Sequence, residues 1–135
     1  MKKAVDYFIS GYSCSESIIK EAIEKGLLPE DEKLIAIASS FSGGMSSGCL
    51  CGAISGAQIV IGYNHGKIGN KISRELAKQF IDEFKKRNNY TCCKALTRGF
   101  DFHTKERKDH CKKMVNDSSE ILEKVLNRVK EEQKV

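Results

Sequence analysis

The chain lacks tryptophan, contains one proline and has no long apolar run among its 135 residues. One proline, with 40% hydrophobic and 30% charged residues, argues against a disordered or repeat-rich chain and is typical of a globular protein. The most apolar run covers residues 51–62, well short of the roughly 20 residues that cross a bilayer. Residues 1–10 lack the uninterrupted apolar region of a signal peptide. We therefore expect a cytoplasmic protein without membrane insertion.

Signatures of hydrolases and of nucleic-acid binding are missing as well. The sequence has no Ser-His-Asp grouping, phosphate-binding glycine motif or paired-carboxylate signature. Its net charge of +5 comes from lysines interleaved with acidic residues, without a basic stripe that includes aromatics. We therefore expect no nucleic-acid partner.

Helical periodicity dominates, and only residues 59–61 have the pattern of a short strand. Helices are expected over residues 1–10, 13–25, 30–41, from 51, over 71–86, and as one or two helices over 109–129. Residues 42–48, with three glycines and three serines, are expected to form a flexible loop, and residues 62–70 a second loop. The prediction is an all-α fold, one compact bundle of about five to seven helices that forms a single domain over 1–135.

The C-terminal helix has an apolar stripe, which more often docks on its own domain than on a partner. A homodimer is left open, with only this stripe to support it. The stripe consists of Ile121, Leu122, Val125, Leu126 and Val129.

Six cysteines stand out, and none forms a CxxC motif. A domain of this length needs no disulfides for its core, and in a reducing compartment many cysteines indicate metal ligation or redox chemistry. We therefore expect folding to bring cysteines together in one site, with one or two serving only as small buried residues. The six are Cys14, Cys49, Cys51, Cys92, Cys93 and Cys111.

Local sequence predicts that these cysteines lie at helix N-termini. Ser13 and Glu16 form a capping box that makes Cys14 the first helical residue. The other expected arrangements are Thr91 as the cap of Cys92–Cys93, Asp109 as the cap for Cys111, and Cys51 at the start of the apolar helix. Unpaired N–H groups stabilise anions there, so we expect these thiols to ionise easily. A thiolate is both a metal ligand and the nucleophile of disulfide exchange.

Two glycines in the apolar helix, Gly52 and Gly56, leave one helical face nearly without side chains. This spacing has two explanations of equal weight: tight packing against another helix, and room for a bound cofactor. The two roles are compatible. The two close pairs, Cys49/Cys51 and Cys92/Cys93, could each supply one ligand and one spare thiol.

Several segments together resemble the C_GCAxxG_C_C family, named for its cysteine pattern and described as redox-active. By this resemblance the family cysteines correspond to Cys14, Cys51, Cys93 and Cys111, while Cys49 and Cys92 are additions and alternates. The resemblance implies a redox theme, without a defined reaction, and a link to transport systems, since members are often encoded near transporter genes. The matching segments are 11–14, 41–45, 51–56, 93–96 and 111–115.

Three functions follow as hypotheses. The first is that the four family cysteines ligate an iron-sulfur cluster for electron transfer or redox sensing, since four thiolates are a common ligand set for such clusters. The second is a metal-free thiol/disulfide protein, and the third a zinc-binding or metal-carrier module. The first two would make the protein an oxidoreductase or its electron carrier, with a redox protein or a small redox-active molecule as partner.

Overall fold

The computed structural model describes residues 2–69, 71–101 and 104–133. Within these ranges the chain forms seven α-helices and one π-helical turn, and no β-strand. The predicted all-α bundle is confirmed, and the strand alternative for residues 59–61 is wrong, since they belong to α4. The elements are α1 (Ala4–Ile9), α2 (Cys14–Glu24), α3 (Glu32–Ser39), η1 (Gly44–Gly48), α4 (Gly52–His65), α5 (Ile72–Asn88), α6 (Cys93–Leu96) and α7 (Lys105–Gln133).

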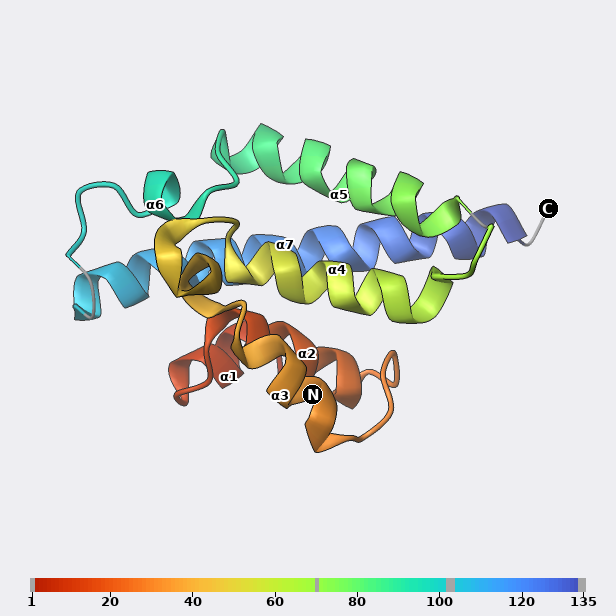
Figure 1. Cartoon of the computed structure of the whole chain (residues 1–135), viewed down its shortest axis with the longest axis horizontal. Helices are drawn as coiled ribbons and strands as arrows, with labels where there is room; N and C mark the ends of the chain where they lie inside the picture. Colours follow the sequence, from red (N-terminus) through yellow and green to blue (C-terminus); the bar gives the residue numbers. More distant parts are fainter. Residues whose placement is uncertain (1, 70, 102–103, 134–135) are drawn as a thin grey trace.

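The apolar helix α4 lies at the centre of the bundle. It packs against α2, α5 and α7, and Figure 1 shows α4, α5 and α7 running side by side along the longest axis. The shorter helices α1–α3 form a second layer along one side, and α6 lies near one end. The central position explains why α4 is apolar on nearly all sides. Its buried hydrophobic residues are Ala53, Ile54, Ala57, Val60 and Ile61.

The amphipathic helices α5 and α7 cover α4 with their apolar stripes. Leu76, Phe80 and Phe84 of α5 are buried, and the last two stack with ring centroids 6.3 Å apart. The whole predicted stripe of α7, from Ile121 to Val129, is buried within the chain. This burial confirms that the stripe docks on the protein itself, so it no longer supports a homodimer.

Two predicted boundaries are wrong. The helix α4 continues to His65, beyond the expected loop start at Gly62. The last helix begins at Lys105, because the Thr104 hydroxyl accepts a hydrogen bond from the Arg107 N–H at 3.2 Å and caps the helix. Asp109, the expected start, lies inside α7.

The segment expected to be a flexible loop has a defined left-handed conformation. Gly43, Gly44, Met45 and Ser46 all have positive φ, with 60° at Met45 and 56° at Ser46. A Cβ at Gly44 would lie 2.5 Å from the Cys49 backbone nitrogen, so the turn is also closely packed. Non-glycine residues in this region are strained, and such strain is often found beside functional sites.

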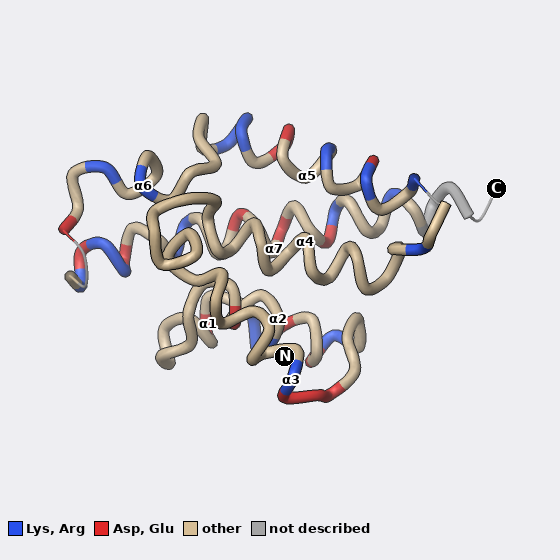
Figure 2. The backbone as a smooth tube through the Cα atoms, viewed as in Figure 1, with Lys and Arg blue, Asp and Glu red and all other residues tan. Residues whose placement is uncertain are grey.

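Basic and acidic positions are interleaved along α5 and α7 (Figure 2). None of the helices in the described ranges is long and apolar enough to cross a membrane.

Candidate functional site

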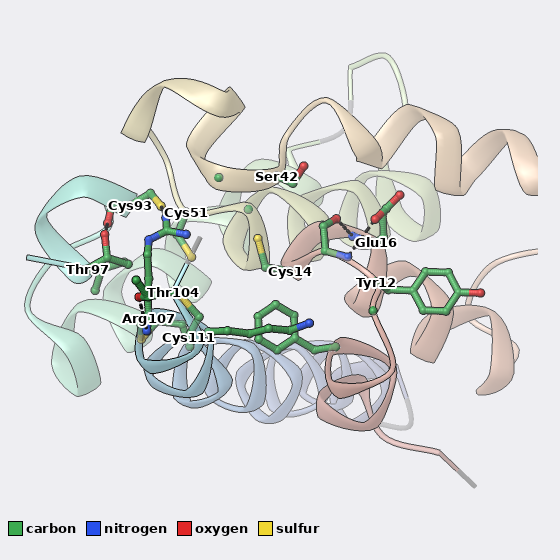
Figure 3. Close-up of a pocket in the computed structure, with 18 residues that line it drawn as sticks. Tyr12, Cys14, Glu16, Ser42, Cys51, Cys93, Thr97, Thr104, Arg107 and Cys111 are labelled. Carbon is green, nitrogen blue, oxygen red and sulfur yellow. Dashed lines mark hydrogen bonds between the residues drawn. The ribbon is translucent and has the colours of Figure 1, made fainter. Parts of the chain in front are cut away.

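A cavity of about 400 Å³ lies where α1, α2, α6 and α7 meet the start of α4. Cys14, Cys51, Cys93 and Cys111 all line it, and Figure 3 shows their side chains gathered around it. They come from α2, the start of α4, α6 and α7. The structure therefore brings together the four cysteines that the family resemblance singled out.

The predicted capping box positions Cys14. The Glu16 N–H donates to the Ser13 hydroxyl at 3.3 Å, and the Ser13 N–H donates to the Glu16 carboxylate at 2.9 Å. Cys14 is therefore the first residue of α2, as expected. The box fixes the direction in which this helix leaves the cavity.

A short pairing of two chain segments positions Cys51 and Cys93. The Cys51 N–H donates to the Thr91 carbonyl at 2.8 Å, and the Cys93 N–H donates to the Cys49 carbonyl at 2.5 Å. Cys51 is thereby the N-cap of α4, and Cys93 is the first residue of α6. Thr91 does not cap α6 as expected, because Cys92 occupies the N-cap position, without a side-chain capping hydrogen bond.

Cys111 does not lie at a helix N-terminus, contrary to the sequence prediction. It lies in the second turn of α7, because the helix begins at Lys105 rather than at Asp109. Its side chain reaches the cavity from the helix surface and is half-buried.

The remaining two cysteines lie outside the cavity. Cys49 and Cys92 are both exposed. The Cys92 thiol donates to the Gly48 carbonyl at 2.9 Å, on the outer side of the paired segments. As alternates to the four family cysteines, these two therefore have less support from the geometry.

The prediction that these thiols ionise easily is wrong for three of them. Burial, followed by repulsion from Cys14, raises the pKa of Cys51 to about 12. Burial also raises the pKa of Cys111 to about 11 and raises the pKa of Cys93. The first backbone N–H groups of α4 lower the pKa of Cys51, but desolvation of the thiolate outweighs them. These thiols therefore need a nearby positive charge to ionise at neutral pH.

Arg107 supplies a positive charge at this site and was not predicted. Its guanidinium donates to the Cys93 sulfur at 3.3 Å. Its charge lowers the pKa of Cys93 and of Cys111, against the larger effect of burial. Residues 99–108 show no clear periodicity, but Thr104 three residues earlier is a helix-cap signal that could have placed Arg107 in the first turn of a helix.

Gly52 and Gly56 of α4 both serve tight packing, and Gly52 also lines the cavity. A Cβ at Gly52 would overlap the Cys14 sulfur, whereas one at Gly56 would lie 2.8 Å from the Ser15 carbonyl oxygen. Gly56 therefore serves the contact between α2 and α4, while Gly52 makes room for a sulfur atom.

Neither described histidine on α4 or α7 lines the cavity. His110 contacts the Leu96 carbonyl oxygen at 2.7 Å and stacks on Phe100, while His65 ends α4. His103 lies outside the described residues. Within the described ranges, no three His, Cys, Asp or Glu side chains are arranged to hold a single metal ion.

Comparison with family models gives one match. A model described as "Putative redox-active protein (C_GCAxxG_C_C)" matches residues 12–125, a range that includes all six cysteines. Comparisons with curated proteins and with solved structures give no match.

Proposed function

This chain belongs to the C_GCAxxG_C_C family, and we propose that its four cavity cysteines bind an iron-sulfur cluster used for electron transfer or redox sensing. The convergence of Cys14, Cys51, Cys93 and Cys111 on one cavity carries this proposal. Four cysteines from four chain segments have no common local reason to meet. A shared ligand explains why they converge, and four thiolates are the usual ligand set of iron-sulfur clusters.

The cavity has features that such a group requires. It has about 400 Å³ of space, and Gly52 contributes no side chain beside the Cys14 sulfur. A Cβ there would fill the space that the sulfur occupies. The missing side chain therefore allows Cys14 to take part in the site together with Cys51.

The raised thiol pKa values also favour a positively charged ligand. The pKa of Cys51 is about 12 because burial disfavours its thiolate and Cys14 repels it. Four thiolates in one cavity are therefore unfavourable without positive charge among them. Bound iron supplies that charge, and the cluster supplies reversible one-electron transfer.

The protein's own groups have separate roles in this proposal. The four cysteines hold the group, and the capping box at Ser13 fixes the helix that presents Cys14. Arg107 donates to the Cys93 sulfur, and such hydrogen bonds tune the reduction potential of a cluster. Burial of Cys51 keeps water from one side of the site.

The zinc alternative has less support. Zinc holds each sulfur at about 2.3 Å, so four thiolates around one ion must lie within roughly 4 Å of each other. No group of three such ligands is arranged for a single ion within the described ranges.

A metal-free dithiol is a second candidate. Repulsion from Cys14 raises the pKa of Cys51, Cys93 and Cys111, so Cys14 is electrostatically coupled to all three. Oxidation of Cys14 and one of these neighbours by a partner's disulfide would form one disulfide in this chain and convert the partner's disulfide into two thiols. This candidate predicts that two thiols are lost per chain on oxidation without bound iron.

The first experiment is to purify the protein without oxygen and measure iron, zinc, acid-labile sulfide and the visible spectrum. The proposal predicts iron with sulfide and a broad absorption near about 400 nm. Both should be lost in Cys51→Ser and in Cys111→Ser, since each variant removes one ligand. Cys49→Ser is the matched control, because this exposed thiol lies outside the cavity.

Each result has a defined meaning. A cluster signal that survives in Cys111→Ser and disappears in Cys49→Ser would overturn the ligand assignment. Zinc alone would favour the metal-carrier module, and thiol oxidation without either metal would favour the dithiol. Because Cys51 is buried, its serine variant could fail to fold, and the partly exposed Cys111 then provides the decisive test.

A further inference from the structure

A second cleft lies on the other side of Cys93 from the four-cysteine cavity. It has a volume of about 690 Å³, and Cys93, Thr97 and Arg107 line both spaces. The exposed Cys92 also lines it. Its volume is within the range of roughly 300–1,000 Å³ that is usual for small-molecule sites.

The lining of this cleft is basic. Lys94, Arg98 and Arg107 all line it, and no acidic residue is among its lining residues. We call this space the basic cleft. Figure 2 shows basic positions on α6 and just after it. Three cations around one concave surface favour a ligand of opposite charge.

Two of these cations have no ion-pair partner among the residues that the structure describes. Lys94 and Arg98 are exposed, and neither takes part in any ion pair among the described residues. By contrast, the basic groups of Arg87, Lys113 and Arg128 are paired with carboxylates. The charges of Lys94 and Arg98 are therefore not compensated by an ion pair within the described part of the chain.

Packing holds one of these cations against the wall of the cleft. A Cβ at Gly48 would lie 3.1 Å from the Lys94 Cβ, so the lysine stem rests on this glycine. Gly48 itself lines the cleft. Phe100 adds an aromatic surface, and its ring stacks on His110 with centroids 4.5 Å apart. The combination of apolar surface and cations is typical of sites for small anionic molecules.

We propose that the basic cleft binds a small molecule with two or more carboxylate or phosphate groups, and that this molecule is the reactant of the redox site. Arginine binds both kinds of oxyanion through two parallel N–H groups. A ligand in the cleft lies against Cys93 and Arg107, which also border the four-cysteine cavity. The role as reactant rests on the proposed redox function, whereas the binding itself does not.

Calorimetric titration at low ionic strength tests the binding, with citrate as the carboxylate probe and inorganic pyrophosphate as the phosphate probe. The double variant Lys94→Gln/Arg98→Gln removes two cleft charges and leaves the four cavity cysteines intact. The control Arg74→Gln/Lys85→Gln removes the same net charge from exposed positions of α5. Thermal melting of each variant checks that it is folded, and Arg98→Gln alone replaces the double variant if the double variant melts early.

We expect at least one probe to bind, with its Kd raised roughly tenfold or more in the cleft variant and changed less than about twofold in the control. The probe that binds identifies the oxyanion as carboxylate, phosphate or either. Binding of neither probe overturns the inference, and so does an equal loss in both variants or no loss in the cleft variant. A protein with a cluster and no anion binding refutes only this inference. Anion binding at the cleft by a protein without a cluster refutes only the proposed function.

Discussion

Alanine substitutions at three glycines of α4 distinguish the role of the four-cysteine cavity from the role of the helix packing around it. In Gly52→Ala the new Cβ would overlap the Cys14 sulfur and lie 3.0 Å from the Phe41 carbonyl oxygen. In Gly56→Ala it would lie 2.8 Å from the Ser15 carbonyl oxygen, a backbone atom. In Gly62→Ala nothing lies within 4 Å. All three positions are in α4, so the chemical change is the same and only the surroundings differ.

The expected stability changes follow from these contacts. Gly62→Ala should stabilise the protein by about 0.5–1 kcal/mol, because alanine favours a helix over glycine. Gly56→Ala should destabilise it by about 1–2 kcal/mol, since overpacking against backbone costs about 1–3 kcal/mol and the same helix preference offsets part of it. Gly52→Ala should also cost about 1–2 kcal/mol, because the Cys14 side chain can rotate away but the Phe41 carbonyl oxygen, 3.0 Å from the new Cβ, is a backbone atom that must shift.

The order of the three variants in iron and sulfide content should differ from their order in stability. Gly52→Ala should lose most iron, sulfide and visible absorption, since the Cys14 sulfur must leave its place. Gly56→Ala, although less stable, should keep these signals while it is folded, and Gly62→Ala should match the unmodified protein. Urea unfolding and anaerobic metal analysis measure the two properties. Full iron and sulfide content in Gly52→Ala, or destabilisation by Gly62→Ala equal to that by Gly56→Ala, would refute the reasoning.

Three further predictions concern other parts of the chain. Arg107→Gln should shift the midpoint potential of the site to more negative values in a redox titration, because it removes a positive charge and a donor beside the Cys93 sulfur; an unchanged potential would contradict this. Asp117→Asn should lower stability at pH 7 by about 1 kcal/mol in urea unfolding, since the carboxylate is paired with neighbouring basic and amide groups. Burial by itself raises the pKa of Asp117, but these partners hold it below its ordinary value. The stability from this carboxylate is therefore present above its unfolded pKa of about 3.9 and lost as pH falls through the folded pKa, so the two proteins should converge in acid. Ser46→Gly should stabilise the protein by about 1 kcal/mol, because glycine relieves the left-handed φ of 56° at this residue. Ser47→Gly should destabilise the protein instead, since Ser47 has no positive φ. Equal stability changes in the two variants would contradict the strain at Ser46.

The helices, and the positions of Cys14, Cys51 and Cys93 at helix starts, were predictable from local sequence. The apolar stripes of α5 and α7 and the capping box at Ser13 depend on residues within one or two turns of each other. Such patterns are visible in the chain order itself. Where local sequence misplaces a boundary, as at Asp109, a competing cap at Thr104 starts the helix earlier.

The properties of the site depend on contacts between distant segments and could not be read from local patterns. Helix capping suggests easily ionised thiols, but burial of Cys51 raises its pKa to about 12. Burial depends on how α2, α4, α6 and α7 pack, and packing also brings Arg107 to the Cys93 sulfur. The sequence by itself determined an all-α chain with cysteines in several helical segments, because helix formation depends on near neighbours. Only the tertiary structure decided that four of those cysteines share one cavity and that Cys49 and Cys92 face outward, because these depend on how the helices fill space together.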